Sequence, residues 1–422
     1  MSKRPLWRGR TLILVGILLA AFNLRTAVTA PSPLFGPIGA DLHFDTAFIG
    51  VLGLLPPAAF AVFGYFTPFI AHRVGLERLA LLGMLLAGAG QLARSFVGES
   101  LGFLIWSIVA LAGMGIGNVV IPPLVKRYFP DRVGTLSTMY LVVLQTGTFV
   151  PPLLAIPIAD GADWRFSVAS WSVLAFLAAL PWIGVLITRR RQKPTAGSAE
   201  DSAAGSVGSA GVDEAPELAT ADQKGRVWRS SVGLGLTLMF ATTSLNTYAM
   251  FTWIPEILIG AGSSEAFAGT MLSLFAGLGL VSGLAMPSVA TRARKPFGYV
   301  LASVFCFLAG YTGLYLAPTT GTVVWICLIG LGPSTFPMGL TMINVRSRTP
   351  IGSTSLSGFV QGVGYAIACL GPLTFGLFHD ATGGWGLSFI FLVAMLILLL
   401  IGGWYACRPL FVEDTWHRRA KG

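Results

Sequence analysis

The sequence has few charged residues. Asp, Glu, Lys and Arg together make up 11% of its 422 residues, whereas soluble domains average about 25%. Hydrophobic residues make up 54%, and the mean hydropathy is +0.74. A water-soluble fold leaves much of its surface in solvent and cannot hide that much apolar surface. The composition therefore excludes an ordinary soluble enzyme and favours a polytopic membrane protein.

Cysteine is also scarce. The four cysteines, which all lie inside apolar runs, are Cys306, Cys327, Cys369 and Cys407. Their placement argues against a disulfide framework or a metal site, so we expect packing roles, no metal and no cofactor. The formal net charge is +10, but the basic residues separate apolar runs and form no stripe interleaved with aromatics. We therefore expect contact with a lipid bilayer and not with nucleic acid.

Twelve apolar runs are long enough to cross a bilayer, which takes about 20 residues each. They are longer than barrel strands and do not alternate, so they predict helices. The predicted spans are 11–31, 48–70, 78–97, 101–125, 134–158, 166–188, 230–254, 265–289, 297–317, 321–345, 353–378 and 385–407. The first span follows a basic leader, but Asn23 and Arg25 interrupt it, so we do not expect a cleaved signal peptide.

The basic residues predict the orientation. Of the 28 Lys and Arg, 25 fall in the N-terminus, the loops after even-numbered spans, or the tail. Only Arg94 and Arg165 fall on the other side, and Arg25 lies inside the first span. The positive-inside rule places both termini in the cytoplasm. We therefore expect a multi-pass protein of the inner (cytoplasmic) membrane.

A polar segment divides the chain. Residues 189–229 are rich in Ala, Gly, Ser and acids, a composition that cannot bury enough apolar surface to fold. We predict a disordered cytoplasmic linker between an N-terminal six-helix half, 1–188, and a C-terminal half with a short tail, 230–422. A weak repeat at nearly constant spacing relates Gly117, Pro122, Gly134 and Gln145 to Gly332, Pro337, Gly352 and Gln361. Two similar halves are typical of secondary transporters that bind substrate between them at the midplane.

Several motifs carry a family resemblance. They are Asn23-Leu24-Arg25, GMGIGNVVIPPLVKRYFPDR at the exit of span 4, Tyr248 with Trp253-Ile254-Pro255, and LSGFVQGVGYAIACLGPLTFGLFHD in span 11. With these motifs the chain resembles the major facilitator superfamily and, within it, the cyanate and nitroimidazole transporter branch (the CynX/NimT family). The resemblance implies an all-α membrane protein with twelve transmembrane helices in two six-helix halves. It also implies a monomer that moves small compounds, either cyanate-like anions inward or nitro-heterocycles outward.

The resemblance also has departures. The superfamily's loop after span 2 usually carries Gly and Asp before a basic cluster, where this chain has Pro68 and His72. The basic residues that we predict to act in gating are Arg73, Lys126, Arg127 and Arg132. Lys126 and Arg127 lie at the cytoplasmic exit of span 4, where they fit better as snorkelled topology anchors, and an electrostatic funnel for anions is the lesser alternative. The Gly-Pro-Gly-Gly motif of antiporters is absent from span 5, which disfavours a drug exporter.

Arg25 is the strongest candidate site residue. It lies about 21 Å along the helix from Thr11, and a charge at that depth costs on the order of 3 kcal/mol. No Asp or Glu falls in the interior of a predicted span. An anion or a polarised nitro or carbonyl group could be the missing partner, since arginine binds such groups in a bidentate manner. The alternative is that Arg25 packs against carbonyls and side-chain amides at a helix break.

Further polar and aromatic residues inside the spans are substrate-binding candidates. They are Asn23, Asn118, Gln145, Asn246, Tyr248, Trp253, Gln361 and Tyr365. Asn23 points about 200° away from Arg25 and fits better as a partner of a neighbouring helix. Asn118 could bind substrate or bridge two helices. Gln145 and Gln361 are related by the repeat, and Tyr365 follows Gln361 by one turn.

The seventh span carries an aromatic stripe. Asn246, Met250 and Trp253 share one helix face, while Tyr248 lies on another. Aromatic side chains here could sandwich a flat ligand. Trp253 alternatively fits a belt residue at the outer membrane edge, because Pro255 and Glu256 follow it.

These residues favour a secondary transporter of a small anionic or strongly polarised solute that works by alternating access, with Arg25 as counter-charge. No Asp, Glu or His lies in the interior of a predicted span, so the usual proton carriers are absent there. A multidrug-type exporter of flat organic compounds is the alternative, although it predicts an embedded acid. An enzyme is not expected, because no cluster of catalytic residue types lies within or beside the spans.

Overall fold

The computed structural model describes residues 10–129, 131–191, 227–293, 296–348 and 350–415. Every regular element in these ranges is a helix, which confirms the all-α prediction. Most of the predicted linker, 192–226, lies outside the described residues. The domain boundaries at 188 and 230 stay predictions.

The first half begins with a segmented span. Its parts are α1 (Thr11–Asn23), α2 (Thr26–Thr29), η1 (Ser32–Leu34) and α3 (Phe35–Leu42). The other helices of this half are α4 (Thr46–Val74), α5 (Leu76–Ala93), α6 (Ser100–Tyr128), α7 (Val133–Gly161) and α8 (Trp164–Arg191). The span that was predicted as 11–31 is therefore longer and broken, with the first break at Leu24 and Arg25.

The second half begins with η3 (Val227–Arg229) and α9 (Ser231–Gly260). It continues with α10 (Glu265–Arg292), α11 (Phe297–Leu316), the segmented α12 (Thr322–Leu331), η4 (Gly332–Ser334) and α13 (Thr335–Val345), and the pair α14 (Pro350–Ala368) and α15 (Leu370–Thr382). It ends with α16 (Gly386–Ala406) and α17 (Val412–Thr415). Spans 10 and 11 are thus each built from two α-helices, which in span 10 are joined by the short η4.

The described helices make twelve passes when the segmented spans are counted once. Within the described residues, eleven of these passes are long and apolar enough, by length and composition, to cross a membrane. The exception is α9, in which 22 of 30 residues are buried. Because α9 lies against other helices and not at the lipid-facing surface, it can carry the Thr, Ser and Asn side chains that lower its hydropathy.

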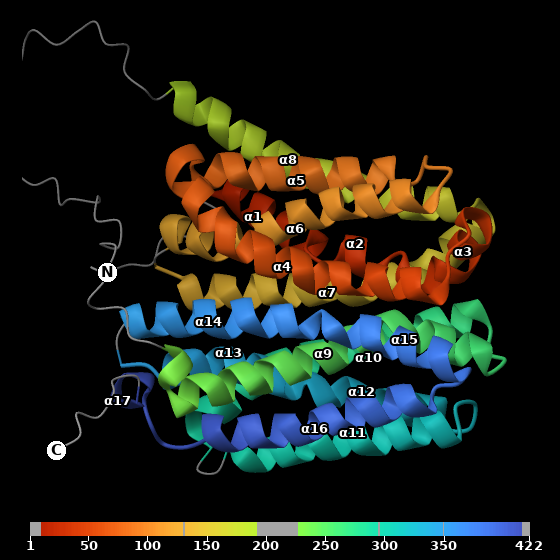
Figure 1. The fold of residues 1–422 in the computed structure, drawn as a ribbon. Coiled ribbons are helices and arrows are strands. Elements are labelled where there is room, and N and C mark those ends of the chain that lie inside the picture. The colour runs from red at the N-terminus through yellow and green to blue at the C-terminus, as the bar shows by residue number, and fades with distance from the viewer. Residues whose placement is uncertain (1–9, 130, 192–226, 294–295, 349, 416–422) are drawn as a thin grey trace, which may run out of the picture.

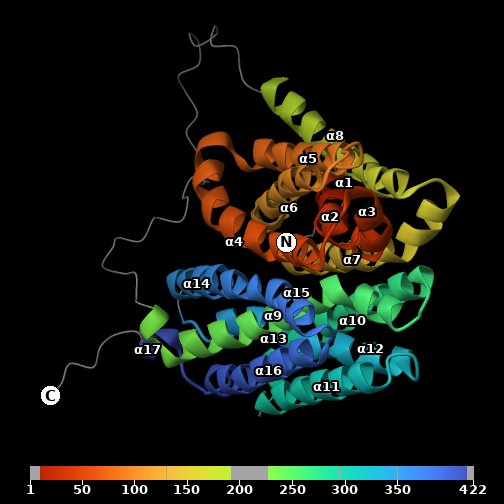
Figure 2. The ribbon, with the colours of Figure 1, turned by 45° about the vertical axis from the view of Figure 1, so that its right-hand side comes forward.

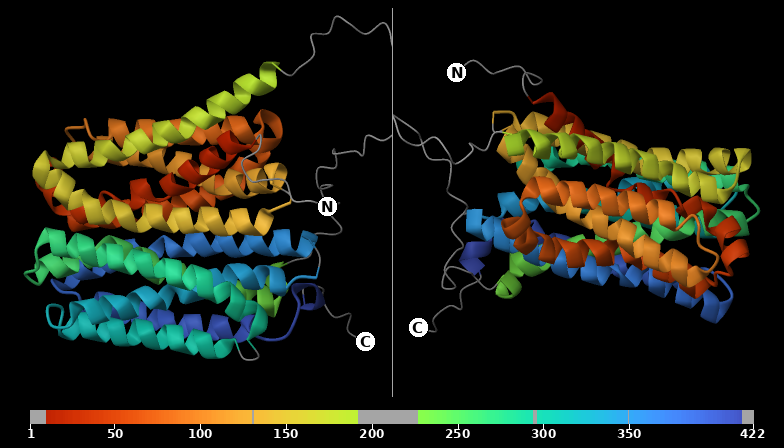
Figure 3. Two further views of the ribbon diagram at one scale, coloured as in Figure 1. Left: turned by 180° about the vertical axis from the view of Figure 1, so that it is seen from behind. Right: turned by 90° about the horizontal axis from the view of Figure 1, so that it is seen from above.

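The two halves lie side by side. Helices α1–α8 form one half and α9–α17 the other, with α7 and α14 at the boundary (Figure 1). Figures 2 and 3 show the same division from other sides. We call the end of the bundle at which α17 lies the terminal end, and the opposite end, which carries α3 and the turn between α9 and α10, the far end (Figure 1).

The halves pack more tightly at the far end. There the Ser32 hydroxyl donates a hydrogen bond to the Phe251 carbonyl at 2.7 Å. A Cβ on Gly53 would overlap Thr252 and lie 2.7 Å from Pro372 Cβ. Toward the terminal end, a Cβ on Gly358 or Gly362 would meet no described atom within 4 Å. The described contacts between the halves are therefore close at the far end, whereas α14 has open space beside Gly358 and Gly362.

Candidate functional site

Arg25 lies at the break in the first span. Its φ and ψ of −130° and −11° are not helical, and the helix resumes at Thr26. The Thr26 hydroxyl donates to the Asn23 carbonyl at 3.2 Å, which satisfies an acceptor that the break frees. Gly147 of α7 makes room for the break, because a Cβ there would lie 2.9 Å from Phe22 Cα. Because Arg25 is not helical, its side chain does not follow the helical periodicity of α1.

The Arg25 guanidinium faces an aromatic ring. Its Cζ lies 4.5 Å from the centroid of Phe60 on α4. Phe60 is 5.9 Å from Tyr365 of α14, and Tyr365 is 6.4 Å from Tyr248 of α9, centroid to centroid. We call Arg25, Phe60, Tyr248 and Tyr365 the central site. Its first two residues come from one half and its last two from the other.

Arg25 has no acidic partner among the described residues. None of their ion pairs involves it, and its described hydrogen bond goes from Nη1 to the Leu24 carbonyl at 3.3 Å. The side chain is half-buried. Since a guanidinium carries five N–H donors, most of its donor capacity is unused by the protein. The alternative prediction was that Arg25 packs against carbonyls at a helix break. The bond to Leu24 agrees with it in part.

Other rings hold Tyr365 in place. Phe240 of α9 contacts Tyr365 edge-on at 5.1 Å, and Phe336 of α13 lies 4.9 Å from Phe240. Gly364 allows this approach, because a Cβ there would lie 2.5 Å from the Phe240 ring. The aromatic wall of the central site is thus backed by packed side chains.

Three of the predicted amides differ in what they contact, and one of them reaches the other half. Gln361 is one turn before Tyr365, and its Nε2 donates to the Ser357 hydroxyl at 2.7 Å. Gln145 reaches the other half, since its Nε2 would lie 2.6 Å from a Cβ on Gly279. Asn118 Nδ2 donates to Met114 in its own helix at 3.1 Å. All three side chains are half-buried, and their roles in substrate binding stay predictions.

Asn23 and Asn246 are buried inside their own halves. We expected Asn23 to bond a neighbouring helix, but its Nδ2 donates to the Leu19 carbonyl of its own helix at 3.0 Å. Asn246 Oδ1 accepts a hydrogen bond from the Tyr311 hydroxyl at 2.9 Å. Neither amide is brought to the central site.

Trp253 is only 1% exposed, so its interpretation as an interfacial belt residue is wrong. Its Nε1 donates to the Pro372 carbonyl at 2.8 Å, and its ring packs against Phe375 and Trp385. The shared face of Asn246, Met250 and Trp253 thus faces the interior of the second half. Tyr248, on the other face, is the residue that reaches the centre.

The predicted gating residues pair within the first half. Arg127 Nη1 lies 3.5 Å from Glu77 Oε1, and the Tyr128 hydroxyl donates to the same oxygen at 2.7 Å. Glu77 is buried at the start of α5. This acid was not among the residues predicted from the sequence. Arg73 is exposed. Lys126 belongs to α6, but its side chain lies outside the described residues.

The fourth predicted gating residue, Arg132, lies 3.9 Å from Asp131, which in turn pairs with Arg10 at 2.7 Å. The hydrogen bond from Arg10 holds the pKa of Asp131 below its usual range. This cluster ties the start of α1 to the turn before α7. A gating function for these residues stays a prediction.

Sequence reasoning missed Phe60 and Arg94. Phe60 is one of many apolar residues in its span, and nothing in the sequence marks it as the ring under Arg25. Arg94 was expected in an outer loop, but it is 1% exposed. Arg25 is therefore not the only arginine within the described helical bundle that is withdrawn from solvent. The signal was present, since Arg94 fell inside the predicted span 78–97.

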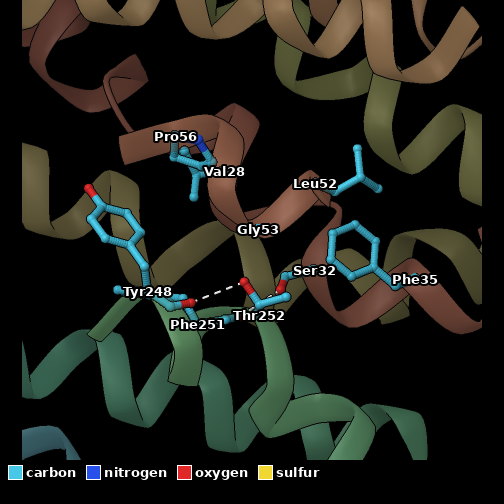
Figure 4. Close-up of a pocket in the computed structure, with 9 residues that line it drawn as sticks. All are labelled: Val28, Ser32, Phe35, Leu52, Gly53, Pro56, Tyr248, Phe251 and Thr252. Atoms are coloured by element: carbon cyan, nitrogen blue, oxygen red, sulfur yellow. Dashed lines mark hydrogen bonds between the residues drawn. The ribbon is translucent and has the colours of Figure 1, made fainter. Parts of the chain in front are cut away.

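A small pocket separates the central site from the far end. Its lining residues, drawn in Figure 4, are Val28, Ser32, Phe35, Leu52, Gly53, Pro56, Tyr248, Phe251 and Thr252. The Tyr248 ring rises from α9 toward the level of Val28 and Pro56 (Figure 4). The cavity volume is about 20 Å³, which suits roughly one water molecule. This pocket is thus too small to hold a solute much larger than water.

Two helical halves that meet around a polar and aromatic centre define a membrane transporter. A family model described as the Major Facilitator Superfamily matches residues 17–372, and the chain belongs to this superfamily.

Three relatives align over nearly the whole chain. The "Uncharacterized transporter YycB" of Bacillus subtilis (strain 168) is 30% identical over 411 residues, which cover 96% of each chain. The "2-nitroimidazole transporter" of Escherichia coli (strain K12) is 29% identical, over 95% of this chain and 96% of its own. The "Cyanate transport protein CynX" of the same organism is 24% identical, over 92% and 95%. The branch suggested by the sequence motifs is therefore confirmed.

A solved structure supports the fold. The chain superposes on a bacterial homolog of the human lysosomal transporter Spinster, in an inward-facing and unoccupied conformation, with a TM-score of 0.70. The match covers 99% of this chain and 100% of the other at 16% identity. At that identity the likeness concerns the fold alone.

Proposed function

We propose that the protein is a secondary transporter of a small anionic or strongly polarised solute, with Arg25 as the counter-charge in the central site. The observation that carries this proposal is a half-buried guanidinium that has no described acidic partner. A charge inside a membrane protein costs free energy unless it is paired or solvated. A transported anion can supply that pairing at the moment of binding.

The surrounding rings favour a small, flat solute. Phe60 holds the guanidinium from one side, while Tyr248 and Tyr365 lie on the opposite half. Tyrosine offers an apolar face and a hydroxyl in one side chain. A cyanate-like anion or a nitro-heterocycle could then contact Arg25 through its polar end and the tyrosines through its π-system. The named solutes of two relatives belong to these two classes.

Alternating access would follow from relative motion of the halves. The far end is closed by contacts such as Ser32 to Phe251 and Gly53 to Pro372. The space around Gly358 and Gly362 lies on the face of α14 that leads to Tyr365. If the positive-inside rule holds, the terminal end is cytoplasmic, and the protein has an inward-facing arrangement in the inner membrane. We expect a monomer to perform this cycle.

A multidrug-type exporter of flat organic compounds is the second candidate. The aromatic wall formed by Phe60, Tyr248 and Tyr365 favours it, because such a wall would also accept neutral rings. In that case Arg25 would serve mainly to hold the break through the Leu24 carbonyl. The two candidates differ in whether binding depends on the Arg25 charge.

Thermal stabilisation of the purified protein tests the proposal. The ligands are cyanate, bicarbonate, nitrate, nitrite, small carboxylates and 2-nitroimidazole, each with wild type and Arg25→Ala. A ligand that binds only the folded protein raises its apparent stability. Arg229→Ala is a matched control, because Arg229 also stacks on a ring, Trp228 at 4.7 Å, but is exposed.

We expect one anion or nitro compound to stabilise wild type and Arg229→Ala by a clearly larger Tm shift than Arg25→Ala. Stabilisation by neutral heterocycles alone, retained in Arg25→Ala, would contradict the anion proposal and favour the exporter.

A further inference from the structure

A second arginine is buried between the central site and the far end. Arg94 follows α5 directly and is 1% exposed. Its Nη1 donates to the Ala27 carbonyl at 3.0 Å, two residues beyond Arg25 in the chain. Its Cζ lies 5.7 Å from the centroid of Phe103. One N–H donor of the Arg94 guanidinium thus holds the segment that carries Arg25, and the Phe103 ring covers one face of the guanidinium.

The rest of the Arg94 guanidinium is unsatisfied by the described chain. Nε and Nη2 are buried and have no hydrogen-bond partner there, and no described ion pair involves the residue. Buried donors are almost always paired, and buried charges are paired or bind a ligand. The charge cannot be removed by deprotonation, since a guanidinium stays protonated in proteins.

A second unsatisfied group lines the same cavity. The Ser107 hydroxyl of α6 is buried without a partner among the described residues. Arg94, Phe103 and Ser107 all line a cavity of about 30 Å³, which also touches Ala27 and Leu111. Phe103, Ser107 and Leu111 are four residues apart and so share one face of α6. Arg94 and Ser107, which together carry two unpaired N–H groups and one unpaired hydroxyl, therefore line one small cavity with no acid among its described lining residues.

We propose that Arg94 and Ser107 form a second binding site, for a small monovalent anion. A cation and a hydroxyl without acceptors are complementary to a negative ion and not to a metal. The volume suits an ion about the size of a water molecule or slightly larger, which excludes a nitro-heterocycle in this arrangement. Bromide or chloride, and the narrow cyanate ion, share the required chemistry.

The second site lies between the central site and the far end. Its cavity shares Val28, Phe35, Leu52 and Pro56 with the pocket that reaches Tyr248. An anion that enters or leaves when the far end opens would therefore meet Arg94 on one side of this pocket and Arg25 on the other. This place on the transport path rests on the proposed function, whereas anion binding at Arg94 does not.

The test uses the purified full-length protein in a gluconate buffer, with sodium bromide and sodium cyanate added separately. Ser107→Ala removes one donor from the cavity, and Arg94→Gln removes the charge. Ser273→Ala is the matched control, because Ser273 is buried in the other half and bonds the Gly269 carbonyl of its own helix. Each substitution is made in wild type and in Arg25→Ala, so that the central site does not contribute in the second set.

We expect bromide to raise the Tm of Arg25→Ala. We expect this shift to be at least halved by Ser107→Ala, abolished by Arg94→Gln and unchanged by Ser273→Ala. Crystals grown in bromide should show an anomalous peak within hydrogen-bond distance of Arg94 Nε or Nη2. This peak and Ser107→Ala decide the question even if Arg94→Gln does not fold. Cyanate stabilisation of Arg25→Ala would identify the site as one for transported anions, and stabilisation by bromide alone would identify a resident inorganic ion.

Two results would overturn the second site. One is the loss of all bromide and cyanate stabilisation in folded Arg25→Ala, which would leave the role of Arg25 intact. The other is a shift that Ser107→Ala and Arg94→Gln do not change. Retention of full anion binding in Arg25→Ala, with loss in Ser107→Ala, would instead support the second site and contradict the proposed role of Arg25.

Discussion

Arg25 and Phe60 form a cation–π pair, with Cζ 4.5 Å from the ring centroid. The break between α1 and α2 presents the cation, and α4 presents the ring. A ring orients a guanidinium without neutralising it, whereas a carboxylate would do both. The charge therefore stays available to a third group. The pair brings a fixed, uncompensated positive charge to the boundary between the two halves.

The first prediction concerns Phe60. Phe60→Leu removes the ring that orients Arg25, so we expect the affinity for the anion to fall by about 2- to 30-fold, which corresponds to the roughly 0.5–2 kcal/mol of a cation–π contact. Phe60→Tyr should retain binding. The measurement is a Kd from ligand titration of the purified protein, and Phe305→Leu, at a lipid-exposed position of α11, is the control. Equal affinities for Phe60→Leu and wild type would show that the ring does not position the charge.

The second prediction concerns closure of the far end. A Cβ on Gly53 would overlap Thr252 and lie 2.7 Å from Pro372 Cβ, so Gly53→Ala should disfavour the closed arrangement. Spin labels on Ala162 and Ala266, exposed residues at the far end of the two halves, should then report longer distances. Gly98→Ala is the control, because a Cβ there meets no described atom within 4 Å. An unchanged distance distribution in folded Gly53→Ala would contradict the proposed closure.

The third prediction separates structure from binding at Trp253. Trp253→Phe leaves the Pro372 carbonyl without its donor, so we expect a loss of about 1–3 kcal/mol in stability, seen as a lower Tm. The ligand Kd should change by less than about twofold, or roughly 0.4 kcal/mol, because Trp253 faces the interior of its own half. Trp404→Phe, at an exposed position, should change neither quantity. A large change in Kd with an unchanged Tm would return Trp253 to the binding site.

The fourth prediction concerns pH and the far end. Asp41 accepts hydrogen bonds from Arg165 and from Trp164 Nε1, and the bond from Arg165 lowers the pKa of the Asp41 carboxyl. A folded-state pKa below the unfolded value contributes stability above about pH 4, and this contribution is lost as the pH falls through the folded pKa. Asp41→Asn should therefore lower the Tm equally at pH 8 and pH 6, and the difference should shrink as the pH falls from about 4 through the folded pKa of Asp41. A difference that grows on acidification would contradict this assignment.

The sequence predicted the helical passes well because bilayer thickness imposes a length on each apolar run. The span predicted as 385–407 is α16, Gly386–Ala406, and 48–70 lies within α4, Thr46–Val74. A break at Arg25 was one of two alternatives that the sequence left open, whereas the breaks at Gly332–Ser334 and at Cys369 could not be located, because the apolar runs continue through them. Each break depends on packing with other helices, as the approach of Gly147 to Phe22 illustrates.

The candidate site was predicted less well. Helical periodicity correctly grouped Asn246 with Trp253 and set Tyr248 apart, but periodicity does not say which face meets the other half. The rings around Arg25 come from α4, α9 and α14, and this proximity arises only from the tertiary fold. Arg94 is buried because it reaches the Ala27 carbonyl, which the break in the first span places within its range.

The most direct test of the account is transport in proteoliposomes. The initial uptake rate would be measured, for the solute that most stabilises wild type, in wild type, Arg25→Lys and Arg25→Ala. We expect Arg25→Ala to be slower by about 10- to 100-fold, since a charge-assisted hydrogen bond contributes roughly 1.5–3 kcal/mol. Arg25→Lys should be intermediate, because it keeps the charge and loses the planar fork. Rates for both variants equal to that of wild type would contradict the central claim.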